Sequence, residues 1–148
     1  MRPKLRVESI PAGTWGLSLA NRLPKEEWND IRQSIYKGAG YRCEICGEDN
    51  AILHCHERWA FRKTGKNKGV QRLVGLVCLC SLCHDCTHFG RSTQVYGKDY
   101  VEVLMKHMQD VNGISKDKLL VYLEEAKRIN YERADIDWTV KIGRKVLV

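Results

Sequence analysis

Nine residues from Cys80 to His88, CSLCHDCTH, carry three cysteines and two histidines. That is more metal-binding chemistry than one tetrahedral ion can use, so part of the stretch must combine with residues elsewhere in the chain. A second Cys-x2-Cys pair lies upstream at Cys43 and Cys46. Each such turn brings two thiolates to one ion, so the pairs Cys43/Cys46 and Cys80/Cys83 together predict a closed structural zinc site.

Three cysteines fall outside this set. Cys86 forms an overlapping Cys-x2-Cys pair with Cys83, which could compete for the ion, whereas Cys78 lies in an apolar stretch and is predicted to be a small core residue. The third is Cys55. The sequence has neither a secretory signal pattern nor a transmembrane run of about 18 apolar residues, so a cytoplasmic protein without membrane contacts is expected. In that reducing compartment, cysteine pairs favour metal binding over disulfides.

Two histidines remain in the opening stretch. If it is helical, His84 and His88 are i and i+4 neighbours, so both imidazoles project from one face and can share an ion. A histidine pair alone is weak evidence, but the preceding segment AILHCHERWAF, which is expected to be a strand, adds His54 and His56. The chain order is therefore a strand with histidines, a loop, a strand, and a helix with histidines.

This order resembles the zinc-ribbon HNH endonucleases, a class of ββα-metal nucleases that includes small phage and bacterial proteins. The stretches YRCEICG, LHCHERW and QRLVGLVCLCSLCHDCTH carry the resemblance. It implies an α+β fold with a ββα-metal core and a four-cysteine zinc knuckle. It also implies that His56 is the general base and that His84 and His88 hold a catalytic ion. Cys55 occupies a further ligand position, where a thiolate would favour zinc-like ions over magnesium, and His54 is the alternative ligand.

One position departs from the motif. The family's asparagine, nine residues before the first metal-binding histidine, corresponds to Gly75. That asparagine usually braces the loop and orients the base, so a substitute is needed. An inactive zinc-ribbon nucleic-acid-binding module is therefore the alternative to an enzyme, and a purely structural or partner-binding zinc protein is a third hypothesis.

The expected chemistry is hydrolysis of DNA phosphodiester bonds. His56, with an ordinary pKa of about 6.5, can accept the proton of the attacking water. A divalent ion (Mg, Mn, Ni or Zn) on His84 and His88 would act as a Lewis acid. Glu57 would orient His56 or hold a metal-bound water. No small-molecule cofactor is expected.

The charge favours a nucleic-acid partner. The net charge is +7 and the pI is about 9.1, which suits a polyanion. A run of basic residues without an acidic one follows the histidine strand and is predicted to grip phosphates: Arg58, Arg62, Lys63, Lys66, Lys68 and Arg72. Double-stranded DNA is the favoured partner, and no protein partner can be named.

The chain length of 148 residues suits a single domain. We expect an N-terminal segment and helix over 1–40, the zinc-knuckle HNH core over 41–92, and a helical extension over 93–148.

Local signals predict the elements that position these residues. A strand is expected at Leu5–Ile10 and a helix at Pro24–Tyr36. AILHCHERWAF and VQRLVGLVCL are predicted strands, joined by the basic loop RKTGKNKG. Ser81 should cap the helix that carries the histidines. Of two further helices, one should end at Asn112-Gly113 and the next should start at Ser115; IDWTVKI alternates as a last strand.

Overall fold

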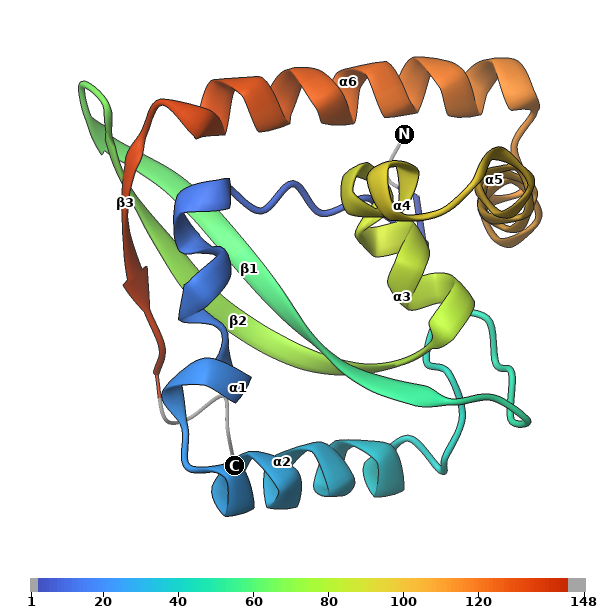
Figure 1. Cartoon of the computed structure of the whole chain (residues 1–148), viewed down its shortest axis with the longest axis horizontal. Helices are drawn as coiled ribbons and strands as arrows, with labels where there is room; N and C mark the ends of the chain where they lie inside the picture. Colours follow the sequence, from blue (N-terminus) through green and yellow to red (C-terminus); the bar gives the residue numbers. More distant parts are fainter. Residues whose placement is uncertain (1–2, 144–148) are drawn as a thin grey trace.

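The computed structural model describes residues 3–143 of the chain. In chain order, its elements are η1 (Ala12–Leu17), α1 (Leu19–Arg22), α2 (Lys25–Gly38), β1 (Leu53–Gly65), β2 (Lys68–Cys80), α3 (Ser81–Thr87), α4 (Phe89–Val95), α5 (Lys98–Asn112), α6 (Lys116–Ala134) and β3 (Asp137–Lys141). As the sequence predicts, helices are mixed with a small sheet, whose strand order is β1-β2-β3 (Figure 1). Within residues 3–143, none of the helices combines the length and apolar character that crossing a membrane requires.

The hairpin of β1 and β2 is the longest feature of the sheet. The two strands pair antiparallel from Leu53↔Cys80 to Gly65↔Lys68, and only Lys66 and Asn67 form the turn, with Asn67 at φ 58°. The predicted loop RKTGKNKG is therefore mostly strand. Lysine, glycine and asparagine are poor strand formers, but the continued ladder and a two-residue turn override that local preference.

The last strand, β3, confirms the strand predicted from IDWTVKI. After α6 it pairs parallel with β2, from Lys68↔Asp137 to Arg72↔Lys141, near the tip of the hairpin. Gly69 permits this approach, because a Cβ there would clash with the Trp138 ring and lie 2.9 Å from the carbonyl oxygen of Arg62.

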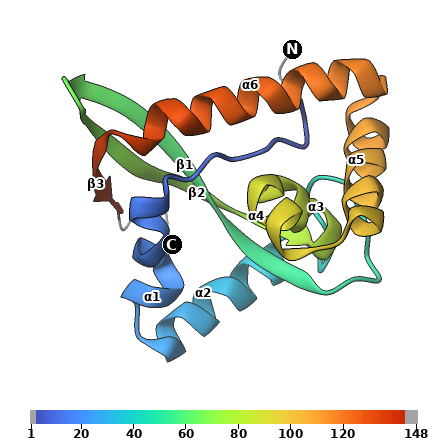
Figure 2. The same cartoon turned by 45° about the horizontal axis from the view of Figure 1, so that its top comes forward.

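The N-terminal segment is not the strand predicted at Leu5–Ile10. It runs extended beside α6, between that helix and the hairpin, in both views (Figures 1 and 2). Its backbone bonds go mainly to side chains of helices: Leu5 N donates to Asn112 Oδ1 at 2.8 Å, and Val7 N donates to the Tyr122 hydroxyl at 2.9 Å. The backbone is extended, as predicted, but its partners are helices, which cannot form the ladder of backbone hydrogen bonds that defines a strand.

The hydrophobic core lies where α3, α5 and α6 meet the end of the hairpin, and it includes the fully buried Leu79, Leu104, Met108 and Leu119. The predicted helix boundaries around Gly113 are confirmed. Gly113 ends α5 at φ 61°, and the Ser115 hydroxyl accepts a bond from the Lys118 N–H at the start of α6.

The predicted helix Pro24–Tyr36 is also present, with slightly different limits. Pro24 is its N-cap rather than its first helical residue, and the helix continues to Gly38.

Candidate metal centres

The four cysteines of the predicted zinc site come together. Ligand atoms of Cys43, Cys46, Cys80 and Cys83 all lie within 4.8 Å of one another, and the Sγ atoms of Cys46 and Cys80 are 3.6 Å apart. Tetrahedral zinc with Zn–S bonds of about 2.3 Å needs sulfurs about 3.8 Å apart. Three of the four residues are buried. This donor set can hold a structural metal such as zinc.

Two local structures position the thiols. The first pair lies in a turn after α2, where Gly47 N donates to Cys43 O at 3.0 Å with Gly47 at φ 81°. The second pair joins β2 to α3: Cys80 is the helix N-cap, and its Sγ accepts from Cys83 N at 3.4 Å. The expectation that Ser81 caps this helix is therefore wrong, because the thiol of Cys80 fills that role.

Hydrogen bonds between the thiols shift their pKa values in opposite directions. Bonds from Cys80 and Cys83 lower the pKa of Cys43, whereas the same contacts with Cys43 raise the pKa of Cys80 to about 12 and raise the pKa of Cys83. Four thiolates at this spacing repel one another unless a cation lies between them. The cluster thus favours a bound divalent ion.

His107 of α5 adds a contact that the sequence motifs do not indicate. Its Nε2 lies 3.2 Å from Cys83 Sγ. An imidazole N–H that donates to a metal-bound thiolate orients the ligand and offsets its charge. The only sequence signal is a histidine within an otherwise ordinary amphipathic helix, 24 residues beyond its sulfur partner.

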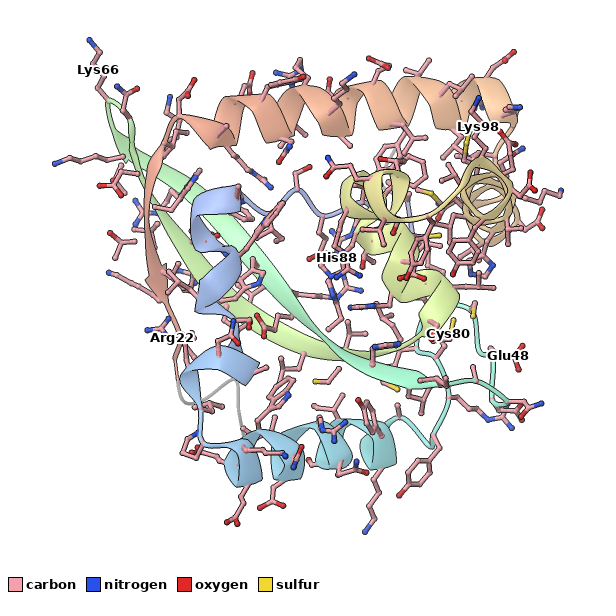
Figure 3. All side chains as sticks on the ribbon, in the orientation of Figure 1. Arg22, Glu48, Lys66, Cys80, His88 and Lys98 are labelled. Atoms are coloured by element: carbon pink, nitrogen blue, oxygen red, sulfur yellow. The ribbon has the colours of Figure 1, made fainter. Side chains whose placement is uncertain are left out.

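Three histidines form a second cluster. Ligand atoms of His56 on β1, of His84 on α3 and of His88, the C-cap residue of α3, lie within 4.8 Å of one another. The ring centroid of His88 is 5.1 Å from that of His56 and 4.7 Å from that of His84. In Figure 3, His88 lies on the side of α3 toward the hairpin and Cys80 at the end of β2, so one short helix serves both clusters.

The surroundings keep His84 and His88 neutral. Burial, and then the neighbouring histidines, lower the pKa of His84 to about 2; burial is also the main cause that lowers the pKa of His88 to about 4. Neutral imidazole is the form that binds metals. His54 is not in the trio: its ring stacks on His84 with centroids 4.4 Å apart, and its Nε2 lies 3.1 Å from Ser81 Oγ.

Glu8 is the site residue that sequence reasoning missed. Its Oε2 lies 2.9 Å from His56 Nε2, its Oε1 accepts from Arg58 Nη1 at 3.3 Å, and its backbone N–H donates to Thr87 O at 2.8 Å. The side chain of His56 is only 3% exposed and that of Glu8 14%. Nothing in the local sequence distinguishes Glu8 from a surface carboxylate.

Cys55 and Glu57 lie on the other face of β1. Strand alternation separates them from His54 and His56. Glu57 Oε1 accepts from Leu19 N at 2.8 Å, and burial raises the pKa of Glu57. Burial likewise raises the pKa of Cys55 to about 12, next to Glu57 and Cys78. The placement therefore disagrees with two expectations: within residues 3–143 Cys55 is not grouped with the clustered histidines, and the carboxylate of Glu57 bonds to Leu19 N.

Gly75 occupies the position at which the resemblance implies an asparagine. Gly75 pairs with Arg58, immediately before a register shift in β1. It offers no side chain to His56, whereas Glu8, which accepts a bond from Arg58, supplies a polar contact to that ring. The polar contact to His56 thus comes from the N-terminal segment rather than from β2.

The predicted phosphate-binding residues separate into two sets. Arg58 turns inward to Glu8. The other five are exposed along the hairpin: Arg62, Lys63, Lys66, Lys68 and Arg72. Lys66, at the tip, is ten residues along the strands from His56, or about 33 Å at the rise of a strand, and Figure 3 shows it far from His88. The basic run therefore forms an arm that leads away from the histidines.

Comparison with known proteins adds no relative to this description. No family model matches the chain, and neither a curated protein nor a solved structure is significantly similar to it. The function has to be argued from the two clusters and the residues around them.

Proposed function

We propose that the protein is a metal-dependent endonuclease of the ββα-metal (HNH) type that hydrolyses DNA phosphodiester bonds. The observation that carries the proposal is the convergence of His56 with His84 and His88 at the junction of the hairpin and α3. A zinc-knuckle scaffold alone has no use for three clustered histidines. The consecutive order β1, β2, α3 is also that of a ββα-metal core.

In this proposal the four cysteines hold structural zinc, and His84 and His88 hold a divalent ion. When bound, that ion supplies Lewis-acid stabilisation of charge on the phosphate and on the leaving oxygen. Both histidines are neutral near pH 7 because their pKa values are lowered, so no proton has to leave before they bind.

His56 is proposed as the general base, with Glu8 as its orienting partner. If Nε2–H donates to Glu8 Oε2, Nδ1 of the neutral ring carries no proton, so Nδ1 is the nitrogen that can accept a proton from water. The Glu8 carboxylate then stabilises the imidazolium that forms. This is the same division of labour as in other carboxylate–histidine pairs, where the carboxylate holds tautomer and orientation.

The exposed arginines and lysines of the hairpin are proposed to bind the DNA backbone. Five cations lie on an arm about 33 Å long, which matches about ten base pairs of duplex at 3.4 Å each. One duplex laid along the arm would therefore reach the histidines at one end and the lysines at the other.

The test is nicking of supercoiled plasmid with Mg²⁺, Mn²⁺, Ni²⁺ or Zn²⁺, together with metal analysis of the same preparations. His56→Ala should retain both metals and lose about 10²–10⁴-fold in cleavage rate, the usual contribution of a general base. If His56→Ala loses the second metal, this histidine is a ligand instead. If the wild type binds DNA but cuts with none of the four ions, the inactive binding module is the better hypothesis.

A further inference from the structure

A pocket of about 360 Å³ lies between α6 and the hairpin, and its lining includes Glu8, the partner of His56. The N-terminal segment contributes Arg6 and Glu8 to its wall, β1 contributes Arg58, and α6 contributes Tyr122 and Arg133. Because Glu8 also contacts His56, this one side chain links the pocket to the histidine cluster.

Two of the pocket's arginines are held in place by the protein. The guanidinium carbon of Arg133 lies 3.7 Å from the centroid of the Phe61 ring, and its Nη1 donates to Ser9 O at 2.7 Å. Arg58 is fixed by Glu8. Among residues 3–143, each of these two guanidinium groups has a single hydrogen-bond acceptor, so most of their N–H donors remain available. Arginines fixed in this way suit phosphate oxygens and base edges.

The charges around the pocket favour an anion. Three arginines line it against two carboxylates, Glu8 and Glu125. Glu8 is already engaged by His56 and Arg58, and Glu125 pairs with Arg128, so neither carboxylate is left to neutralise a further cation. Apart from Ser9, the rest of the lining is apolar or aromatic, although Arg133 covers one face of Phe61: Val7, Trp59, Ala60, Phe61, Val74, Tyr122, Ala126 and Ile129.

We propose that this pocket binds one unpaired nucleotide of the nucleic-acid substrate, next to the phosphate that is cut. A phosphate group matches the arginines, and a flat base matches the apolar and aromatic wall. The volume lies at the lower end of small-ligand sites, so a stacked base pair cannot enter and the nucleotide has to leave the duplex. The proposal rests on the proposed nuclease function, and it adds a preference for DNA with an unpaired base.

The test measures binding without added divalent metal, so that no strand is cut. Two otherwise identical DNA duplexes are compared by fluorescence anisotropy, one fully paired and one with a single unpaired 2-aminopurine. The wild type should bind the second about tenfold more tightly, as expected for one stacked base. The 2-aminopurine emission should also change on binding, because its surroundings become protein.

Three variants of α6 assign the effect to the pocket. Ala126→Phe fills the pocket and Arg133→Gln removes its fixed cation, so each should abolish the preference for the unpaired base. Lys127→Gln removes the same charge at an exposed neighbouring position and should keep the preference. Circular dichroism and the zinc content of each variant show whether it has folded, and Arg133→Gln alone decides the matter if Ala126→Phe has not.

Two results would overturn the proposal: equal affinity of the wild type for both duplexes, or a preference that survives in folded Arg133→Gln. Neither result depends on cleavage. A protein that cuts plasmid but shows no preference therefore refutes only the pocket, and one that shows the preference but never cuts refutes only the nuclease.

Discussion

Replacement of Glu8 tests the proposed catalytic arrangement most directly, because this residue is recognisable only in the structure. Glu8→Gln keeps the side-chain size and an oxygen acceptor but removes the negative charge beside His56. Loss of an orienting carboxylate of this kind typically costs about 10–100-fold in activity or metal affinity. We expect Glu8→Gln to fall in that range while its stability stays close to that of the wild type.

Glu8→Ala should add a loss of stability to the loss of activity. It leaves the Nε2 of His56, whose side chain is 3% exposed, without its partner, and an unsatisfied buried polar group costs about 1–3 kcal/mol. The side chain of Arg58 is 23% exposed and can form hydrogen bonds with water instead, so its lost contact should add little to the loss of stability. Urea unfolding of zinc-loaded protein measures the change in stability, and single-turnover plasmid nicking measures the change in catalysis.

Glu57→Gln is the matched control. It is the same substitution at the carboxylate expected from the sequence to orient His56 or to hold a metal-bound water, yet Glu57 bonds to Leu19 N on the opposite face of β1. Its nicking rate should equal that of the wild type. Normal nicking by Glu8→Ala, or a loss of nicking confined to Glu57→Gln, would show that the carboxylate has been assigned to the wrong face.

Three further predictions concern the metals and the DNA. Cys43→Ser should give insoluble or zinc-depleted protein, because structural zinc contributes about 10 kcal/mol or more to folding, whereas Cys55→Ser should keep its zinc; a folded, zinc-free Cys43→Ser would remove the assignment. His84→Ala should lose the second metal and the activity but keep the cysteine-bound zinc in metal analysis, and retention of both metals would exclude it as a ligand. Replacement of Lys63, Lys66 and Lys68 by glutamine should weaken DNA binding. It should also reduce the slope of log K against log salt by about 0.9 for each phosphate that is no longer neutralised, and an unchanged slope would place the hairpin away from DNA.

The parts of the site that depend on local spacing could be predicted. A Cys-x2-Cys turn and an i, i+4 histidine pair bring their side chains together within a few residues, so the cysteine cluster and the His84–His88 pair follow from the sequence. The motif position of Cys55 conflicts with strand alternation, which places Cys55 opposite His54 and His56. In the structure, alternation prevails over the motif.

The remaining parts depend on contacts between distant residues. Glu8 reaches His56 across 48 positions, and no local pattern specifies that pairing. The residues of the basic loop disfavour strands when taken by themselves, yet β3 arrives from the end of the chain and pairs beside Lys68. In each case the determining partner comes from a terminal part of the chain, which a window of neighbouring residues does not include.

The position of the N-terminal segment also bears on when the protein becomes active during its synthesis. This segment is made first, but it is held by residues made much later: Leu5 by Asn112, Val7 by Tyr122, and Ser9 by the backbone of Ala126. Glu8 itself bonds to Thr87 and His56, but the residues that hold the segment on either side of it are made only with α5 and α6. In the proposed nuclease, an unfinished chain would thus hold its orienting carboxylate less firmly, which would protect the DNA of the cell that makes it from partial products.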